Sequence, residues 1–262
     1  MTSEPLELAF AEYGEGPPLV ITHGLFGMGR NWTPIAKTLA EGFHVFLVDL
    51  RNHGDSPWAD GMEYPEIAAD LAHFIDQHTP SPATLIGHSM GGKAAMTVAL
   101  EHPGMVSRLV VADIAPTPYD HDFSANLDAM KSLDLASFKR RREAQAALAE
   151  ALGDKALASF LIHNLRHSDA QGFRWRLNLE AISGHVDDLL DFPIYEADSA
   201  YEGPTLFMAG DQSPYIRPYH HVEIERLFPK ATIEFIENAG HWIHAEQPAS
   251  VTKKILTFLN QK

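Results

Sequence analysis

The stretch Leu85–Gly92 constrains the fold of this chain most, because it joins an apolar run to a helical pattern through the motif Gly-x-Ser-x-Gly. The segment that follows, Lys93–Glu101, is rich in helix formers with apolar residues at helical spacing. A sharp strand-to-helix turn holds its central serine in strained backbone dihedrals and exposes the hydroxyl. Gly87 and Gly91 suit such a turn, because side chains there would collide across it. The stretch therefore predicts a nucleophile elbow with Ser89 at its tip.

Short apolar runs alternate with helical patterns along much of the chain. The runs are Leu19–Thr22, Val45–Val48, Leu85–Ile86, Leu109–Ala112, Leu206–Ala209 and Ile233–Ile236. Such alternation predicts an α/β fold, with a mostly parallel twisted sheet flanked by helices. Leu6–Tyr13 alternates apolar and polar residues, so we expect an antiparallel edge strand there. Helices are predicted between Glu63 and His78 and from Pro248 onward.

The alternation breaks between about Pro116 and Pro204, where the pattern is helical and predicts no strand. We expect residues 1–116 and 204–262 to form the core domain and residues 117–203 a helical cap over the carboxyl ends of the strands, where open α/β sheets bind ligands. Six aromatic residues are candidates to contact substrate: Phe26, Tyr119, Phe123, Phe160, Trp175 and Trp242. Those in the inserted segment have a simpler alternative role as the cap's own core.

Composition narrows the class of partner. The net charge of −15 disfavours nucleic acid and acidic membrane surfaces, and the basic run Lys139–Arg142 is interpreted as a solvated helix face. The chain has no cysteine, which excludes disulfides, thiolate metal sites and a cysteine nucleophile. The first ten residues lack a signal-peptide pattern, and nowhere do 18 apolar residues run together. We therefore expect a cytoplasmic protein with no membrane insertion.

A serine nucleophile needs a base, an acid to orient that base, and donors for an oxyanion. His241 lies between the last predicted strand and the last helix, which places it at the right end of the sheet to be the base. His244 is three residues on and suggests a metal pair, but no third ligand has suitable spacing, so no metal is expected. Asp113 and Asp211 each follow a predicted strand, and from spacing alone either can be the acid.

The oxyanion donors are expected in the segment His23–Gly27, which directly follows the strand Leu19–Thr22. One backbone N–H would come from Leu25, or alternatively Phe26, and the other from Met90. Glycines in this segment let the backbone approach a substrate closely.

Five segments together resemble the α/β-hydrolase superfamily, and specifically the small serine esterases of the YbfF type and their mitochondrial relatives. These segments are His23–Gly27, Asp49–Pro57, Gly87–Ala94, Ala112–Pro116 and Asn238–Pro248. The resemblance covers nearly the whole chain, and it is strong for the sheet domain and weaker for the cap. It implies that the charged loop Asp49–Pro57 braces its neighbours as a turn.

The resemblance also bears on the acid. Most of the superfamily carries its acid three residues after a glycine that ends the penultimate strand, and counting from Gly210 lands on Ser213. Asp113 matches the displaced acid of the YbfF-like group, so the resemblance favours Asp113 over Asp211. It makes Ser213 a supporting neighbour of the acid and base.

The implied activity is hydrolysis of carboxylic esters with small to medium apolar acyl groups, through an acyl-enzyme on Ser89 and without a cofactor. The partner would be a small-molecule ester, and the protein a monomer or homodimer. Thioester hydrolysis and C–C bond hydrolysis use the same triad and remain alternatives. A non-catalytic ligand receptor is a further alternative.

Overall fold

A computed structural model describes residues 4–80, 82–168, 170 and 172–261 of the chain. A seven-stranded sheet forms its centre, in the order β1-β3-β2-β4-β5-β8-β9. Its strands are β1 (Phe10–Tyr13), β2 (Pro18–Thr22), β3 (His44–Val48), β4 (Ala83–His88), β5 (Val106–Ala112), β8 (Thr205–Gly210) and β9 (Ala231–Ile236). Only β1 pairs antiparallel within this sheet, so the predicted mostly parallel sheet is confirmed.

The predicted edge strand is shorter than expected. It lies at the sheet edge and pairs antiparallel with β3, but it begins at Phe10 rather than Leu6. The backbone N–H of Leu6 donates to the Asp70 carboxylate at 2.8 Å, and that of Ala9 donates to the Ser56 hydroxyl at 2.8 Å. These backbone N–H groups thus donate to side chains, whereas in a longer strand they would pair with β3.

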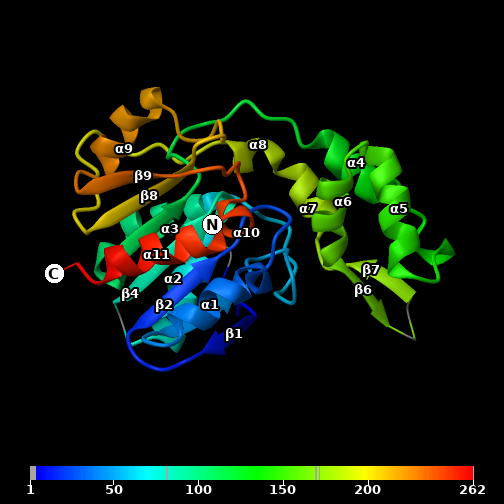
Figure 1. The fold of residues 1–262 in the computed structure, drawn as a ribbon, viewed down its shortest axis with the longest axis horizontal. Helices are drawn as coiled ribbons and strands as arrows, with labels where there is room; N and C mark the ends of the chain where they lie inside the picture. The colour runs from blue at the N-terminus through cyan, green and yellow to red at the C-terminus, as the bar shows by residue number, and fades with distance from the viewer. Residues whose placement is uncertain (1–3, 81, 169, 171, 262) are drawn as a thin grey trace.

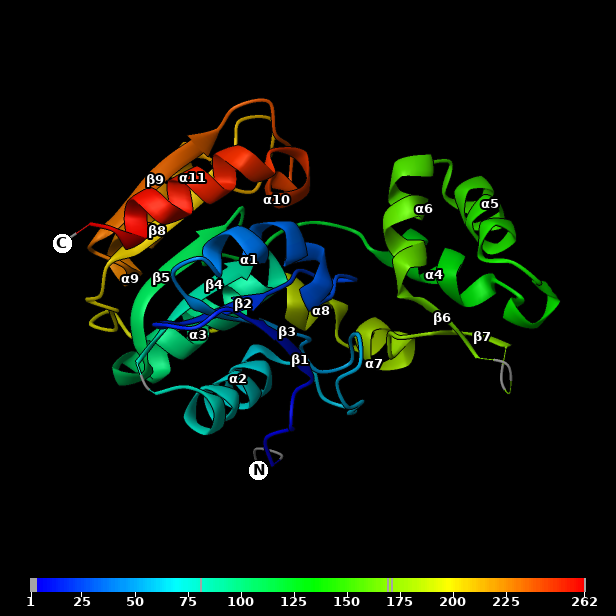
Figure 2. The same cartoon turned by 60° about the horizontal axis from the view of Figure 1, so that its bottom comes forward.

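Helices cover both faces of the sheet (Figure 2). The first face carries α2 (Tyr64–His78), α3 (Met90–Glu101) and α9 (His221–Leu227), whose apolar residues share one core cluster. The second face carries α1 (Thr33–Leu39) and α11 (Pro248–Leu259), which share another. Within β2, Val20 belongs to the first cluster while Leu19 and Ile21 belong to the second, as the two-residue period of a strand requires.

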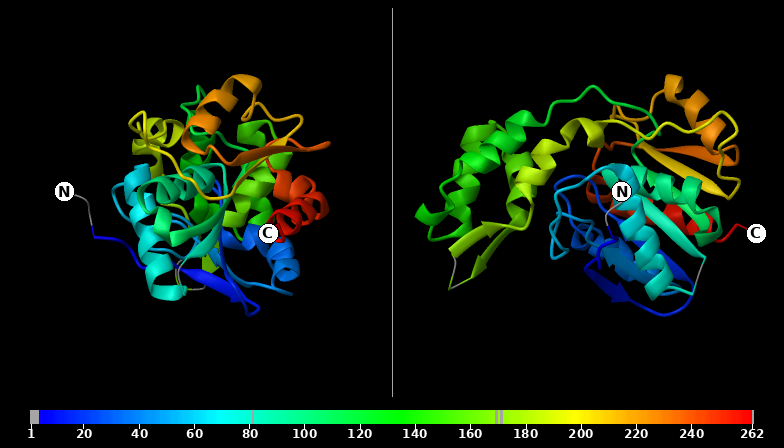
Figure 3. Two further views of the ribbon diagram at one scale, coloured as in Figure 1. Left: turned by 90° about the vertical axis from the view of Figure 1, so that its left-hand side faces the viewer. Right: turned by 180° about the vertical axis from the view of Figure 1, so that it is seen from behind.

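Most of the inserted segment lies beside the sheet domain, and its last helix lies against that domain (Figures 1 and 3). Its helices are α4 (Ser124–Ser132), α5 (Arg141–Leu152), α6 (Lys155–Leu161), α7 (Leu179–Gly184) and α8 (Val186–Leu190). The expectation of no strand here is wrong, because β6 (Leu165–Ser168) and β7 (Gly172–Trp175) pair antiparallel. Each strand has only four residues, too few for an alternating pattern to stand out in the sequence.

The chain returns to the sheet domain directly after α8. Tyr64 donates its hydroxyl to the Leu189 carbonyl at 2.8 Å, and the Lys93 ammonium donates to the carbonyls of Leu190 and Asp191 at 2.8 and 2.6 Å. Tyr201 is buried and donates to the Val106 carbonyl at 3.0 Å. We therefore propose that the core domain resumes near residue 191, before the expected boundary at 204.

The remaining helical elements are short. They are the 3-10 turns η1 (Gly29–Trp32), η2 (Pro103–Met105), η3 (Leu135–Ser137), η4 (Ile162–Asn164) and η5 (Pro218–His220), and the helix α10 (Ile243–Glu246). Within the described ranges, no helix combines the length and apolarity needed to cross a membrane.

Candidate active site

Ser89 occupies the turn between β4 and α3 with a left-handed φ of 51° and a ψ of −119°. Its backbone N–H donates to the Ala112 carbonyl on β5 at 3.0 Å, which ties the turn to the neighbouring strand. A Cβ at Gly87 would lie 2.2 Å from the Gly91 carbonyl oxygen, and one at Gly91 would lie 2.5 Å from the His23 carbonyl oxygen. Only glycine fits at both positions, so the turn has the form that the motif predicts.

A hydrogen-bonded chain runs from Ser89 to a buried carboxylate. The Ser89 Oγ lies 3.0 Å from the His241 Nε2, and the His241 Nδ1 lies 2.8 Å from the Asp113 Oδ2. Because a carboxylate only accepts, the Nδ1 carries the proton and the Nε2 lone pair faces the serine hydroxyl. This arrangement can take the serine proton.

Asp113 is fully buried at the end of β5 and is bonded on both oxygens. Its Oδ1 accepts from the Gly210 N–H at 2.9 Å, and its Oδ2 accepts from the Ser213 hydroxyl as well as from His241. Ser213 therefore contacts the carboxylate. Asp211 is exposed and its carboxylate accepts from the Ala239 N–H at 3.1 Å, so its bond is to the backbone before His241 and not to the imidazole.

The His241 ring is held from two further sides. Tyr215 stacks on it with ring centroids 4.0 Å apart and an interplanar angle of 25°. The His241 carbonyl accepts from the His88 Nε2 at 2.8 Å. Stacking and a backbone anchor both restrict rotation of the imidazole, which favours a fixed distance to Ser89.

The oxyanion segment offers Leu25 rather than Phe26. The Phe26 N–H donates to the His53 Nε2 at 3.2 Å and is therefore engaged. None of the hydrogen bonds found in the described ranges uses the N–H of Leu25 or of Met90. The cap holds the same segment, because the Asn164 amide donates to the Phe26 carbonyl at 2.7 Å.

Two buried histidines support this segment in their neutral form. Burial lowers the pKa of His23 to about 4 and that of His53 to about 3. The His53 Nδ1 bonds the Arg51 carbonyl at 2.9 Å, so its Nε2 is free to accept from Phe26. The His23 Nε2 accepts in the same way from the Leu50 N–H at 3.0 Å.

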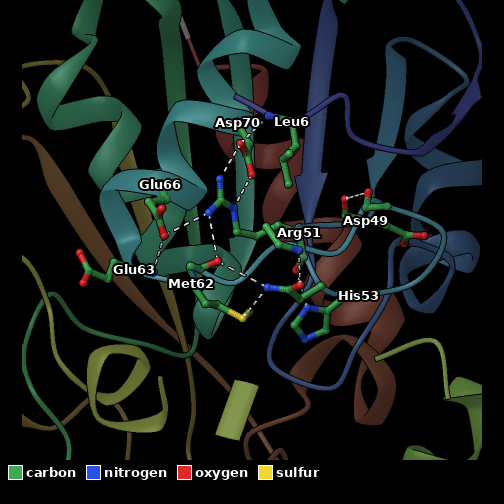
Figure 4. Close-up of polar contacts among 12 residues, drawn as sticks. Leu6, Asp49, Arg51, His53, Met62, Glu63, Glu66 and Asp70 are labelled. Atoms are coloured by element: carbon green, nitrogen blue, oxygen red, sulfur yellow. Dashed lines mark hydrogen bonds and ion pairs between the residues drawn. The ribbon is translucent and has the colours of Figure 1, made fainter. Parts of the chain in front are cut away.

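The loop after β3 is fixed by an ion-paired arginine (Figure 4). Arg51 is buried and lies 2.6 Å from Asp70 and 3.1 Å from Glu66, both on α2. Its backbone carbonyl bonds His53, which in turn bonds Phe26. These contacts fit the interpretation of Asp49–Pro57 as a brace.

Ser89 borders two cavities, one larger than the other. Of the six aromatic candidates, Phe26, Phe123, Phe160 and Trp242 line the larger cavity, and Tyr119 and Phe123 line the smaller. Trp175 lines neither, which corrects the expectation for that residue. Its indole N–H donates to the Met130 carbonyl at 3.1 Å, so Trp175 packs within the cap.

His244 takes part in ring packing. Its imidazole stacks on Trp32 with centroids 4.6 Å apart and an interplanar angle of 9°. In the part of the chain that the structure describes, the ligand-type side chains close enough to share an ion are Glu63, His185 and Asp188, and these line neither cavity at Ser89.

Sequence reasoning missed several residues that hold the site: His53, His88, Lys93, Asn164 and Tyr215. His53 and His88 lie inside motifs that carry the resemblance, so their position was a usable signal. Asn164 and Tyr215 lie in segments without a motif, and only the folded chain brings them to the site.

Comparison with known proteins decides the family. A model described as the alpha/beta hydrolase fold matches residues 17–248. The chain belongs to this family. It is 43% identical to a zebrafish (Danio rerio) protein named sn-1-specific diacylglycerol lipase ABHD11, over 98% of this chain and 84% of that one. It is 34% identical to Esterase YbfF of Escherichia coli, over 93% of each chain.

A solved structure named marine microorganism esterase superposes with a TM-score of 0.92 and 40% identity, covering 97% of this chain and 99% of that one. These similarities confirm the predicted fold and the predicted resemblance to YbfF-type esterases. They also confirm the predicted class of enzyme, an ester hydrolase.

Proposed function

We propose that this alpha/beta hydrolase cleaves carboxylic esters through an acyl-enzyme on Ser89, with His241 as the base and Asp113 as the acid. The observation that carries the proposal is the unbroken chain from Ser89 Oγ through His241 to Asp113, with distances of 3.0 and 2.8 Å. Serine, imidazole and buried carboxylate in this order activate a hydroxyl for attack on a carbonyl carbon.

In the first half-reaction, His241 Nε2 takes the proton of Ser89 while Oγ bonds to the carbonyl carbon. The carbonyl oxygen becomes an oxyanion, and the N–H groups of Leu25 and Met90 donate to it. The protonated imidazole then gives its proton to the alcohol oxygen as the C–O bond breaks. The alcohol leaves and the acyl group stays on Ser89.

In the second half-reaction, water takes the place of the alcohol. His241 accepts the water proton, the hydroxyl adds to the acyl carbon, and Ser89 leaves with the proton returned by His241. Asp113 stabilises the imidazolium in both halves and fixes its tautomer without taking the proton. Its bonds from Gly210 and Ser213 hold the carboxylate in place.

Initial rates on p-nitrophenyl acetate and butyrate test the proposal. Ser89→Ala should lower kcat by about four orders of magnitude or more, since removal of a triad serine leaves only binding and oxyanion stabilisation. Ser107→Ala, at an exposed serine of β5, is the matched control and should keep the parent rate. Full activity in Ser89→Ala would overturn the assignment of the nucleophile.

The cytoplasmic location and the monomeric or homodimeric state stay predictions from the sequence. Sedimentation velocity of the purified protein measures the second directly.

A further inference from the structure

Two cavities meet at Ser89 and share four lining residues: Leu25, Ser89, Phe123 and Tyr215. An ester bound to Ser89 has two substituents, the acyl chain and the alcohol, and each needs its own space. The residues that line each cavity indicate which substituent it can hold.

The residues that we assign to the reaction line different cavities. His241 lines only the larger cavity, whereas Met90, whose N–H we assign to the oxyanion, lines only the smaller one. The leaving alcohol oxygen must come within hydrogen-bond distance of His241 Nε2 to receive its proton. The acyl chain leaves the same carbon in another direction, away from the imidazole.

We propose that the alcohol part of the ester occupies the larger cavity and the acyl part occupies the smaller one, beside Met90 and Lys93. This inference rests on the proposed function, because it takes Ser89 as the nucleophile and His241 as the proton donor. It adds a substrate class: esters of a short acyl group with a larger, apolar alcohol.

Three buried residues in the wall of the smaller cavity are the reason that the acyl group must be short. Tyr64, Lys93 and Leu189 line this cavity and are all buried. Tyr64 and Lys93 are bonded to the carbonyls of residues 189–191, so the wall is tied to the end of α8. A long chain would have to break these bonds and desolvate the ammonium further.

Lys93 adds a polar group to this wall. Its ammonium lies 5.0 Å from the centroid of the Tyr119 ring and 5.6 Å from that of Tyr64. Burial lowers the pKa of Lys93 to about 7, and the charge of Asp191 opposes this shift only in part. The wall that a longer acyl chain would have to displace therefore includes a buried amine.

The larger cavity is lined by a different set of residues. Asn126, Leu157 and Phe160 of the cap and Trp242 of the core line it, and all four are partly exposed. A long or branched alcohol can extend past a partly exposed rim, while it keeps apolar contact with Leu157 and Phe160. The two cavities thus differ in size and in the residues that line them.

Two substrate series on the parent enzyme test the inference. The first keeps the p-nitrophenyl leaving group and lengthens the acyl chain from acetyl to palmitoyl. The second keeps the acetyl group and lengthens the alcohol from methanol to octanol. We expect kcat/KM to fall at least about tenfold from butyryl to decanoyl in the first series and to rise about tenfold from methyl to hexyl in the second. A rise with acyl length in the first series would overturn the inference.

A matched pair of variants locates the effect. Leu189→Ala enlarges only the smaller cavity and should move the acyl optimum to longer chains without changing the ranking of alcohols. Leu157→Ala enlarges only the larger cavity and should change the ranking of alcohols alone. The exchanged pattern would assign the cavities the other way round. If Leu189→Ala fails to fold, Ile114→Val removes a single methyl from the same cavity and gives the same readout on a smaller scale.

Failure of this inference can be told apart from failure of the proposed function. If the folded parent enzyme hydrolyses no ester of either series, the proposed function is wrong. If hydrolysis is lost in Ser89→Ala but the parent prefers long acyl chains, only the division of the substrate is wrong.

Discussion

The sheet side and the cap side of the site are built differently. On the sheet side, Ser89 and Asp113 follow the ends of strands with left-handed φ angles of 51° and 53°, and bonds from neighbouring strands and loops fix them. On the cap side, Leu157 and Phe160 contribute partly exposed apolar surface to the same cavity. In the proposed mechanism the sheet domain therefore supplies the reacting groups, and the cap supplies part of the pocket wall.

The largest expected effect is the loss of activity on replacing Asp113, which we assign as the acid of the triad. Asp113→Asn should lower kcat by about four orders of magnitude, because an amide at this position holds the imidazole in the wrong tautomer. Asp211→Asn is the matched control and should change kcat less than about threefold, since its side chain bonds only the backbone of Ala239. Steady-state rates on p-nitrophenyl butyrate measure both. A large loss in Asp211→Asn with little loss in Asp113→Asn would reverse the assignment.

The next expected effect is a loss of folding stability at low pH, caused by buried histidines of the sheet domain. Burial lowers the pKa of His23 to about 4 and the pKa values of His53 and His244 to about 3, below the ordinary value of 6.5. The unfolded chain therefore binds more protons than the folded chain as the pH falls below 6.5. Stability is present in full above that pH and is lost toward pH 4, by at most about 1.4 kcal/mol per pH unit for each such histidine.

Urea denaturation at pH 7, 6 and 5 measures this loss. His53→Gln keeps an acceptor for the Phe26 N–H but removes one titrating group, so its stability should fall less steeply with acid. The comparison between parent and variant within this pH window isolates the histidine. A free energy of unfolding that is constant from pH 7 to pH 5 in the parent would contradict the prediction.

A smaller effect on kcat should follow from removing a hydrogen bond between the cap and the sheet domain. Asn164 lies in the cap and donates to the carbonyl of Phe26, the residue that follows Leu25. Asn164→Ala should lower kcat about tenfold with little change in KM, because a displaced oxyanion donor weakens binding of the transition state more than binding of the substrate. Asn260→Ala, at the exposed end of α11, is the control. An effect confined to KM would place Asn164 in substrate binding instead.

The sheet side of the site is easier to predict from the sequence than the residues that only tertiary packing brings to it. Short sequence motifs predict the positions of Ser89 and His241 at the ends of strands. Such motifs combine glycines at fixed spacing with a strand before a helix. Asn164 and Tyr215 reach the site only through tertiary packing, and nothing in their own segments indicates it. The antiparallel pairing of β6 with β7 could not be predicted for a related reason, since strands of four residues are too short to show a clear alternation.

The smallest expected effect separates two tryptophans that composition alone cannot distinguish. Trp175 bonds the Met130 carbonyl inside the cap, whereas Trp242 lines the larger cavity and packs 5.5 Å from the Phe160 ring. Trp175→Phe should destabilise the protein by about 1 kcal/mol through the lost indole bond and leave kcat/KM within about twofold. Trp242→Phe should change KM for esters of large alcohols while stability changes less. A change in KM in Trp175→Phe, measured on hexyl acetate, would bring that residue back to the substrate and would weaken the division between the cap's own core and the pocket wall.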